Sequence, residues 1–228
     1  MGVLQRRRGA PLPVSHTRVY LAEMSLALQL LHTVCGVWVR DVSLTNTMLD
    51  ARGHVLIGDF GSACRAASGR VTGVACAPEF AAPEVARTHK DYCDGAADAV
   101  HPYDGGTADW WAFGVVAFEL MASRPPWWDP DANRLLALLA AGPPVVSFPE
   151  GVAVHPDGMS LCQELLCPDD DAFRCRCDDD IRSHAFFAGG VDWDKLGEGE
   201  GPDPPTREEI ETAARFPEYP LDTIPRTG

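Results

Sequence analysis

Residues 38–61 read Trp-Val-Arg-Asp-Val-Ser-Leu-Thr-Asn-Thr-Met-Leu-Asp-Ala-Arg-Gly-His-Val-Leu-Ile-Gly-Asp-Phe-Gly and carry the most informative side chains of the chain. Within them, Asp41 is followed by Asn46 and then by Asp59. Carboxylate and amide oxygens are the ligands that magnesium prefers, and a carboxylate can also accept a proton. A simple turn capped by Asp59 would explain the last three residues alone. The ordered series of three side chains favours a shared site instead.

Apolar patterning on both sides of this stretch predicts a mainly α-helical fold with a few short β-strands. Apolar residues recur at helical spacing in residues 18–32, whereas residues 109–121 are apolar on nearly every side, as in a helix at the centre of a core. A loop rich in small and polar residues occupies positions 62–84. We further expect strands at 37–39, 47–49 and 54–57, a turn at 50–53, and helices at 135–141, 160–166 and 179–187.

The chain length of 228 residues suffices for one sizeable domain with tails, and a hydrophobic content of 46% supports a substantial core. We expect a basic, proline-containing and disordered leader at residues 1–17 and one domain at residues 18–196. An acidic, proline-rich tail should follow at residues 197–228, with a helical turn at residues 207–214.

Charge and cysteine usage restrict the classes of partner. A net charge of −14 disfavours nucleic acid and anionic membranes as main partners. No apolar run reaches membrane-spanning length. The eight cysteines have no spacing typical of a disulfide framework, which is the usage expected in a reducing compartment. The sequence therefore predicts a cytoplasmic protein without a membrane span and without a nucleic-acid partner.

The quoted stretch resembles the catalytic and magnesium loops of protein kinases, which carry Arg-Asp, then Asn, then Asp-Phe-Gly in this order. Ala82-Pro83-Glu84 resembles the triplet that closes a kinase activation loop, and we use this name for residues 62–84. Residues 109–114 resemble the start of the central helix of the large lobe, and residues 181–196 its end. Over about residues 18–196 the chain is similar to the C-terminal lobe of AGC-group Ser/Thr kinases, nearest the myotonic-dystrophy-kinase and citron-kinase branch. This implies a protein-kinase-like fold of which only that lobe is present.

The resemblance also implies a reaction and a set of site residues. Asp41 and Asn46 would be the catalytic residues, with Asp41 as the general base for a substrate hydroxyl. ATP and Mg²⁺ would be the cofactors, and Asn46 and Asp59 would be the magnesium ligands. The full cofactor-binding set would be Asn46, Met48, Gly58 and Asp59.

Other residues would order the activation loop and tether it to the lobe. Arg40 would order the loop, and Gly61 would let the backbone change direction because glycine tolerates unusual dihedral angles. Glu84 would form an ion pair with Arg174, or with Arg176 in another register. The full tethering set would be Arg40, Phe60, Gly61, Glu84, Asp109 and Arg174.

Three positions depart from the kinase pattern. Val39 replaces the usual histidine, Ser43 replaces the lysine that meets the γ-phosphate, and Ala77 replaces the threonine that bonds to this lysine and to the base. No Gly-rich loop, strand lysine or partner glutamate precedes residue 18, so we expect the small lobe to be absent.

Two functions stay open on this basis. One is a Ser/Thr protein kinase that transfers the γ-phosphate of ATP to a protein hydroxyl and is present as a truncated catalytic lobe. The other is a catalytically impaired pseudokinase lobe that acts as a protein-binding module, which the three departures favour. The first implies a protein substrate. The kinase branch suggests cytoskeletal or Rho-type GTPase signalling partners, by analogy alone.

Overall fold

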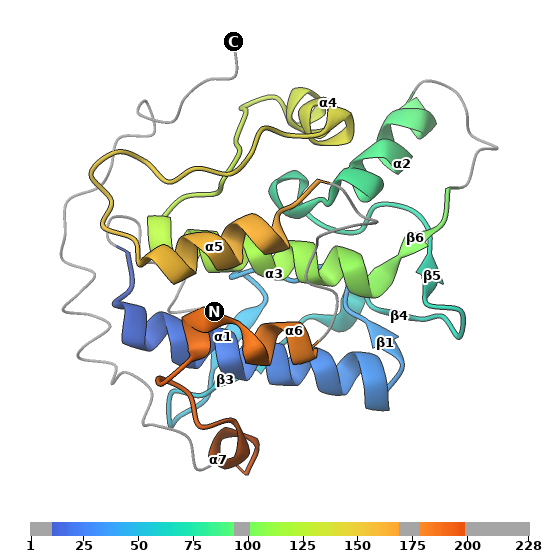
Figure 1. Ribbon diagram of the computed structural model, residues 1–228. Helices are drawn as coiled ribbons and strands as arrows, with labels where there is room; N and C mark the ends of the chain where they lie inside the picture. The colour runs from blue at the N-terminus through green and yellow to red at the C-terminus, as the bar shows by residue number, and fades with distance from the viewer. Residues whose placement is uncertain (1–10, 94–100, 169–177, 199–228) are drawn as a thin grey trace.

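The computed structural model describes residues 11–93, 101–168 and 178–198. Figure 1 shows helices α1 and α3 side by side, α5 lying across α3, and helices α2 and α4 together at one end of the molecule. The helices are α1 (Val14–Gln29), α2 (Pro83–Cys93), α3 (Gly105–Ala122), α4 (Ala132–Ala141), α5 (Pro156–Leu165), α6 (Asp178–Ser183) and α7 (Trp193–Gly197).

The strands are short and lie in three antiparallel pairs among the described residues. Strand β1 pairs with β4, β2 pairs with β3, and β5 pairs with β6. Their bounds are β1 (Val37–Trp38), β2 (Thr47–Leu49), β3 (Val55–Ile57), β4 (Cys64–Arg65), β5 (Arg70–Val71) and β6 (Tyr103–Asp104). The predicted mainly helical fold with a few short strands is confirmed.

Helix α3 is the centre of the core. All of its residues except Thr107 and Glu119 are buried, as its lack of a polar face predicts. A Cβ atom on Gly114 would lie 2.7 Å from Cβ of Leu165, so the absence of a side chain at this position lets α5 pack directly on α3. Trp111 stacks on Trp127 with ring centroids 5.5 Å apart, which closes the core beyond the end of the helix.

The first helix begins earlier than the residue 18 start that its spacing predicts. It starts at Val14, immediately after Pro13, whose φ of −52° suits a helix entry. Leu12 is buried and donates its N–H to the carbonyl of Leu120, so the predicted disordered leader is wrong for residues 11–17. Residues 1–10 lie outside the described part of the chain. After Gln29 the helix continues as one π-helical turn, Leu30–Val34.

The strand–turn–strand prediction at residues 47–57 is confirmed by β2 and β3, which pair in the register Met48↔Leu56. The plain loop expected at residues 62–84 instead contains β4, β5 and the start of α2. Helix α2 has Pro83 at its first position, where the missing N–H costs nothing, and it runs to Cys93. The predicted helical turn at residues 207–214 lies outside the described residues.

Candidate functional site

Asp41 and Asn46 are joined directly. The side-chain Nδ2 of Asn46 donates to Oδ2 of Asp41 at 2.8 Å and to the Asp41 carbonyl oxygen at 2.9 Å. The backbone N–H of Ala77, at the far end of the activation loop, lies near this carboxylate and lowers the pKa of Asp41. The two hydrogen bonds from Asn46 fix the Asp41 carboxylate relative to its own backbone.

Asp59 shares an electrostatic environment with Asp41. Burial raises the pKa of Asp41, and the negative charge of Asp59 raises it further, whereas the hydrogen bonds from Asn46 and Ala77 lower it. Asp59 itself is exposed. Two repelling carboxylates beside an amide oxygen form a set of oxygen donors that suits a hard divalent cation. Among the described residues, no cluster of three or more His, Cys, Asp or Glu side chains could hold a metal ion. Further ligands of a bound cation would therefore come from substrate or water.

The backbone around Asp59 differs from the expected arrangement. Asp59 has a φ of +53°, whereas Gly61 has no positive φ, so the prediction that Gly61 supplies the unusual dihedral angle is wrong. Gly61 instead donates its N–H to Oδ1 of Asp59 at 3.2 Å, and a Cβ on Gly61 would come within 3.1 Å of that oxygen. A side chain at position 61 would therefore require the Asp59 carboxylate to shift by a few tenths of an ångström. Phe60 beside it is 48% exposed.

Met48 and Gly58 lie together on the β2–β3 hairpin. Gly58 is buried and donates its N–H to the carbonyl of Asn46 at 2.8 Å, which places the hairpin end beside the Asp41–Asn46 pair. A Cβ on Gly58 would be only 2.5 Å from Cε of Met48. Met48 is 39% exposed and its cross-strand neighbour Leu56 is 47% exposed, so the hairpin presents an apolar surface next to the carboxylates.

Asp109 anchors the backbone that leads into Asp41. Its carboxylate is 1% exposed and accepts the N–H of Val39 at 2.8 Å and the N–H of Arg40 at 2.7 Å. His32, at the end of the first helix, lies 2.8 Å from the same carboxylate. Arg40 adopts a φ of +64°, which is uncommon for a residue with a side chain, and the two hydrogen bonds to Asp109 hold it there.

The Arg40 side chain reaches the activation loop. Its Nη2 donates to the carbonyl oxygens of Thr72 at 2.7 Å and Gly73 at 3.0 Å. The hydroxyl of Tyr103 donates to the same Gly73 oxygen at 2.8 Å and lies close to the guanidinium. Arg40 therefore links the backbone beside Asp41 to the middle of the loop.

The structure shows the surroundings of the three residues that depart from the kinase pattern. Val39 is fully buried in the core. Ser43 is buried, and its hydroxyl lies 2.6 Å from that of Thr45 and accepts the backbone N–H of Asn46 at 3.3 Å, so it is bonded within the loop. Ala77 contributes only its backbone N–H to Asp41.

The expected ion pair of Glu84 with Arg174 cannot be placed, because Arg174 and Arg176 lie outside the described residues. Glu84 is in the first turn of α2.

The sequence analysis did not identify His32 and Tyr103 as residues that contact the site. His32 is 77 positions from Asp109, and Tyr103 is 30 positions from Gly73, so no local spacing signals either contact.

None of the described helices combines the length and the apolar content that crossing a membrane requires.

A model of the protein kinase domain matches residues 2–187. Serine/threonine-protein kinase MRCK gamma of Homo sapiens is 31% identical over 195 residues, which cover 84% of this chain and 12% of that protein.

Two further relatives are similar at the same level. Protein kinase C zeta type of Oryctolagus cuniculus is 34% identical, over 85% of this chain and 31% of its own length. The cAMP-dependent protein kinase catalytic subunit of Arthrobotrys oligospora is 32% identical, over 97% of this chain and 40% of its own length. The chain thus spans 12% to 40% of the length of these three relatives. With the protein kinase domain matched over most of its residues, the chain belongs to the protein kinase domain family, and its relatives are AGC-group Ser/Thr kinases.

Proposed function

We propose that this chain carries the large lobe of a Ser/Thr protein kinase, which transfers the γ-phosphate of ATP to a Ser or Thr hydroxyl of a protein substrate. The observation that carries the proposal is the grouping of Asp41, Asn46 and Asp59. Asn46 bonds to Asp41, and the charge of Asp59 acts on the Asp41 carboxylate. Phosphoryl transfer needs this grouping of a proton acceptor and oxygen ligands more than it needs covalent chemistry.

Each residue has a defined task in this proposal. Asp41 accepts the proton of the substrate hydroxyl, and Asn46 holds its carboxylate toward that hydroxyl. Asn46 and Asp59 bind Mg²⁺, which when bound holds the ATP phosphates and spreads their charge. Met48 provides the apolar surface under the adenine, and Gly58 lies beside Asp59. Arg40 and Asp109 fix the backbone before Asp41.

A second candidate function is a pseudokinase lobe that binds other proteins. It is supported by Ser43, whose hydroxyl is engaged by Thr45, and by Ala77, whose side chain offers no hydrogen bond to Asp41. The missing lysine charge at about 4 Å from a phosphate corresponds to at most about 4 kcal/mol at an effective dielectric near 20. This energy equals roughly three decades in rate, so such a site is slow and not necessarily inactive.

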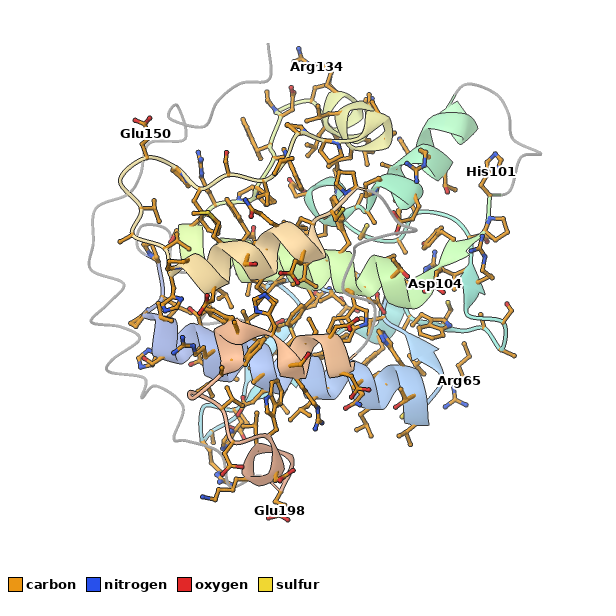
Figure 2. All side chains as sticks on the ribbon, in the orientation of Figure 1. Arg65, His101, Asp104, Arg134, Glu150 and Glu198 are labelled. Carbon is orange, nitrogen blue, oxygen red and sulfur yellow. The ribbon has the colours of Figure 1, made fainter. Side chains whose placement is uncertain are left out.

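A thermal-shift titration with ATP in the presence of Mg²⁺ and, in parallel, with EDTA tests whether the proposed magnesium site exists. If the proposed kinase site exists, ATP stabilises the chain only with Mg²⁺, and Asp59→Ala abolishes this stabilisation. Glu150→Ala is the matched control, because Glu150 is an exposed carboxylate that Figure 2 shows at the outer rim of the molecule. Stabilisation that persists in Asp59→Ala, or that is the same with EDTA, contradicts the magnesium site.

Turnover is then measured with radiolabelled ATP and a mixture of protein substrates, with Asp41→Asn as the inactive reference. The assay is run on this chain and on a version extended by any upstream coding sequence. Transfer that depends on Asp41 supports the kinase. Magnesium-dependent ATP binding without any transfer in either version supports the pseudokinase.

We further propose a cytoplasmic location, which rests on cysteine usage typical of a reducing compartment. Cytoskeletal or Rho-type GTPase signalling partners are a proposal from the kinase branch alone. Cell fractionation and co-purification with the tagged chain test the two statements separately.

A further inference from the structure

The Gly73 carbonyl oxygen is a meeting point of three parts of the fold. It accepts one hydrogen bond from Nη2 of Arg40 at 3.0 Å and another from the hydroxyl of Tyr103 at 2.8 Å. Arg40 follows β1, Gly73 is in the activation loop, and Tyr103 is in β6. Both lone pairs of one carbonyl are thus occupied by side chains from outside the loop.

Each participant in this contact is held in place by a further feature of the fold. Arg40 is fixed by the hydrogen bond from its N–H to buried Asp109. Tyr103 is 5% exposed and pairs with Val71 in the β5–β6 ladder, two residues before Gly73. Gly73 has a φ of +75°, a conformation that glycine adopts at little cost, and this turns its carbonyl toward both donors.

The acceptors around the Arg40 guanidinium are neutral. In the described part of the chain they are the carbonyls of Thr72 and Gly73, with the Tyr103 hydroxyl and the Cys64 thiol close by. Burial raises the pKa of Tyr103, so its hydroxyl keeps its proton and remains a donor at neutral pH.

We propose that Tyr103 is a positioning residue, which latches the activation loop onto Arg40 through the Gly73 carbonyl and so keeps the loop ordered without phosphorylation. The latch acts on the site through Ala77, four residues farther along, whose backbone N–H lies near the Asp41 carboxylate. Loss of the latch lets this end of the loop move away from Asp41. The link to catalysis rests on the proposed kinase function, whereas the ordering of the loop does not.

The test is amide hydrogen exchange on the full chain, produced in bacteria and shown by intact mass to be unphosphorylated. In the wild type, peptides covering residues 68–77 should be protected. Tyr103→Phe removes only the hydroxyl, and these peptides should then exchange several-fold to about tenfold faster, as expected from the loss of one neutral hydrogen bond. Peptides from α3 and from the β2–β3 hairpin should be unchanged.

Tyr20→Phe is the matched control, because it removes the hydroxyl of another buried tyrosine, on α1. It should leave exchange in residues 68–77 at the wild-type rate. Equal exchange of these residues in wild type and Tyr103→Phe overturns the proposal. So does faster exchange spread evenly over the molecule, or loop protection that arises only after phosphorylation of the chain.

A second readout distinguishes this proposal from the kinase assignment. If transfer activity is found, Tyr103→Phe should lower kcat several-fold while the KM for ATP stays unchanged, because the nucleotide surface is on the β2–β3 hairpin. An unchanged kcat together with faster loop exchange removes the link to Asp41. Absence of activity in all versions counts against the kinase, and the exchange experiment still decides whether the latch exists.

Discussion

The side-chain amide of Asn46 donates two hydrogen bonds to Asp41, one to the carboxylate at 2.8 Å and one to the backbone carbonyl at 2.9 Å. Both amide protons of Asn46 are thereby used within one short loop. The pair makes Asn46 a structural support for the Asp41 carboxylate, in addition to its proposed role as a magnesium ligand.

Asn46→Asp should destabilise the chain by about 1–3 kcal/mol at pH 7. The substitution replaces a donor with a carboxylate and adds a negative charge beside Asp41, whose pKa should rise further. Urea denaturation at pH 7 and pH 4 measures the effect, which should shrink at pH 4 because protonation removes the repulsion. Asn133→Asp is the control, since Asn133 is exposed in the first turn of α4, where a negative charge is favourable. An equal loss of stability in both variants would contradict the prediction.

Asp109→Asn should cost about 3 kcal/mol of stability. One amide oxygen cannot replace two carboxylate oxygens that accept from Val39, Arg40 and His32, and the new NH₂ group meets backbone donors. Chemical denaturation measures the loss. Asp104→Asn is the comparison, because Asp104 is an exposed cap that Figure 2 shows at the start of α3, and asparagine is also a good helix cap. A similarly small effect of both substitutions would argue against Asp109 as the anchor.

Glu119 should make stability depend on pH near neutrality. Desolvation of this partly buried side chain on α3, and then the negative charge of Glu79, raise the pKa of Glu119 to about 7. Because the folded pKa lies above the ordinary value near 4.5, the stabilising contribution is fully present below pH 4.5 and is lost as the pH rises through 7. Glu119→Gln removes this dependence, so its stability should exceed that of the wild type by up to roughly 3 kcal/mol at pH 8 and by little at pH 5.

Denaturation curves for the wild type and Glu119→Gln at pH 5, 6, 7 and 8 provide the measurement. Glu79→Gln is a graded control, because it removes the negative charge of Glu79 but leaves Glu119 desolvated. The pKa of Glu119 should then fall only part of the way toward 4.5, and the pH dependence of stability should shift with it. A constant difference between Glu119→Gln and wild type across this range would show that Glu119 does not titrate near 7.

Two glycine substitutions should differ in their cost to stability. Gly114→Ala places a Cβ 2.7 Å from Cβ of Leu165, where neither helix can yield, and should cost about 2 kcal/mol. Gly58→Ala meets only the flexible end of Met48, at 2.5 Å, and should cost less than about 1 kcal/mol.

Under the proposed function, Gly58→Ala should instead weaken ATP binding, because Met48 is displaced into the nucleotide surface. Thermal denaturation and an ATP titration of both variants measure the two effects. A larger stability loss in Gly58→Ala than in Gly114→Ala would contradict the packing described for these helices and this hairpin.

Sequence patterns predicted the elements that carry a strong local signal. Helix α3 is apolar on all sides, and the β2–β3 hairpin has β-type residues on both sides of a turn, so both follow from short stretches alone. The two-residue strands β4 and β6 are too short for any periodicity, and their pairing depends on distant partners. Their existence was therefore not predictable from local pattern.

The same distinction applies to the site. Asp41, Asn46 and Asp59 were found from the order of residues in one stretch, and their catalytic and metal-binding roles stay predictions. The contact of Tyr103 with Gly73 and that of His32 with Asp109 form only when the whole domain folds. The unusual backbone angle that the sequence assigned to Gly61 belongs to Asp59, whose carboxylate accepts the N–H of Gly61.

Because Asp109 belongs to the buried central helix and also binds the peptide groups of Val39 and Arg40, the loop that carries Asp41 is part of the same cooperative folding unit as the core. Partial unfolding at the chain ends can then occur without disturbing this loop. Conversely, substitutions deep in α3, far from any substrate, should alter the loop as strongly as changes made beside it.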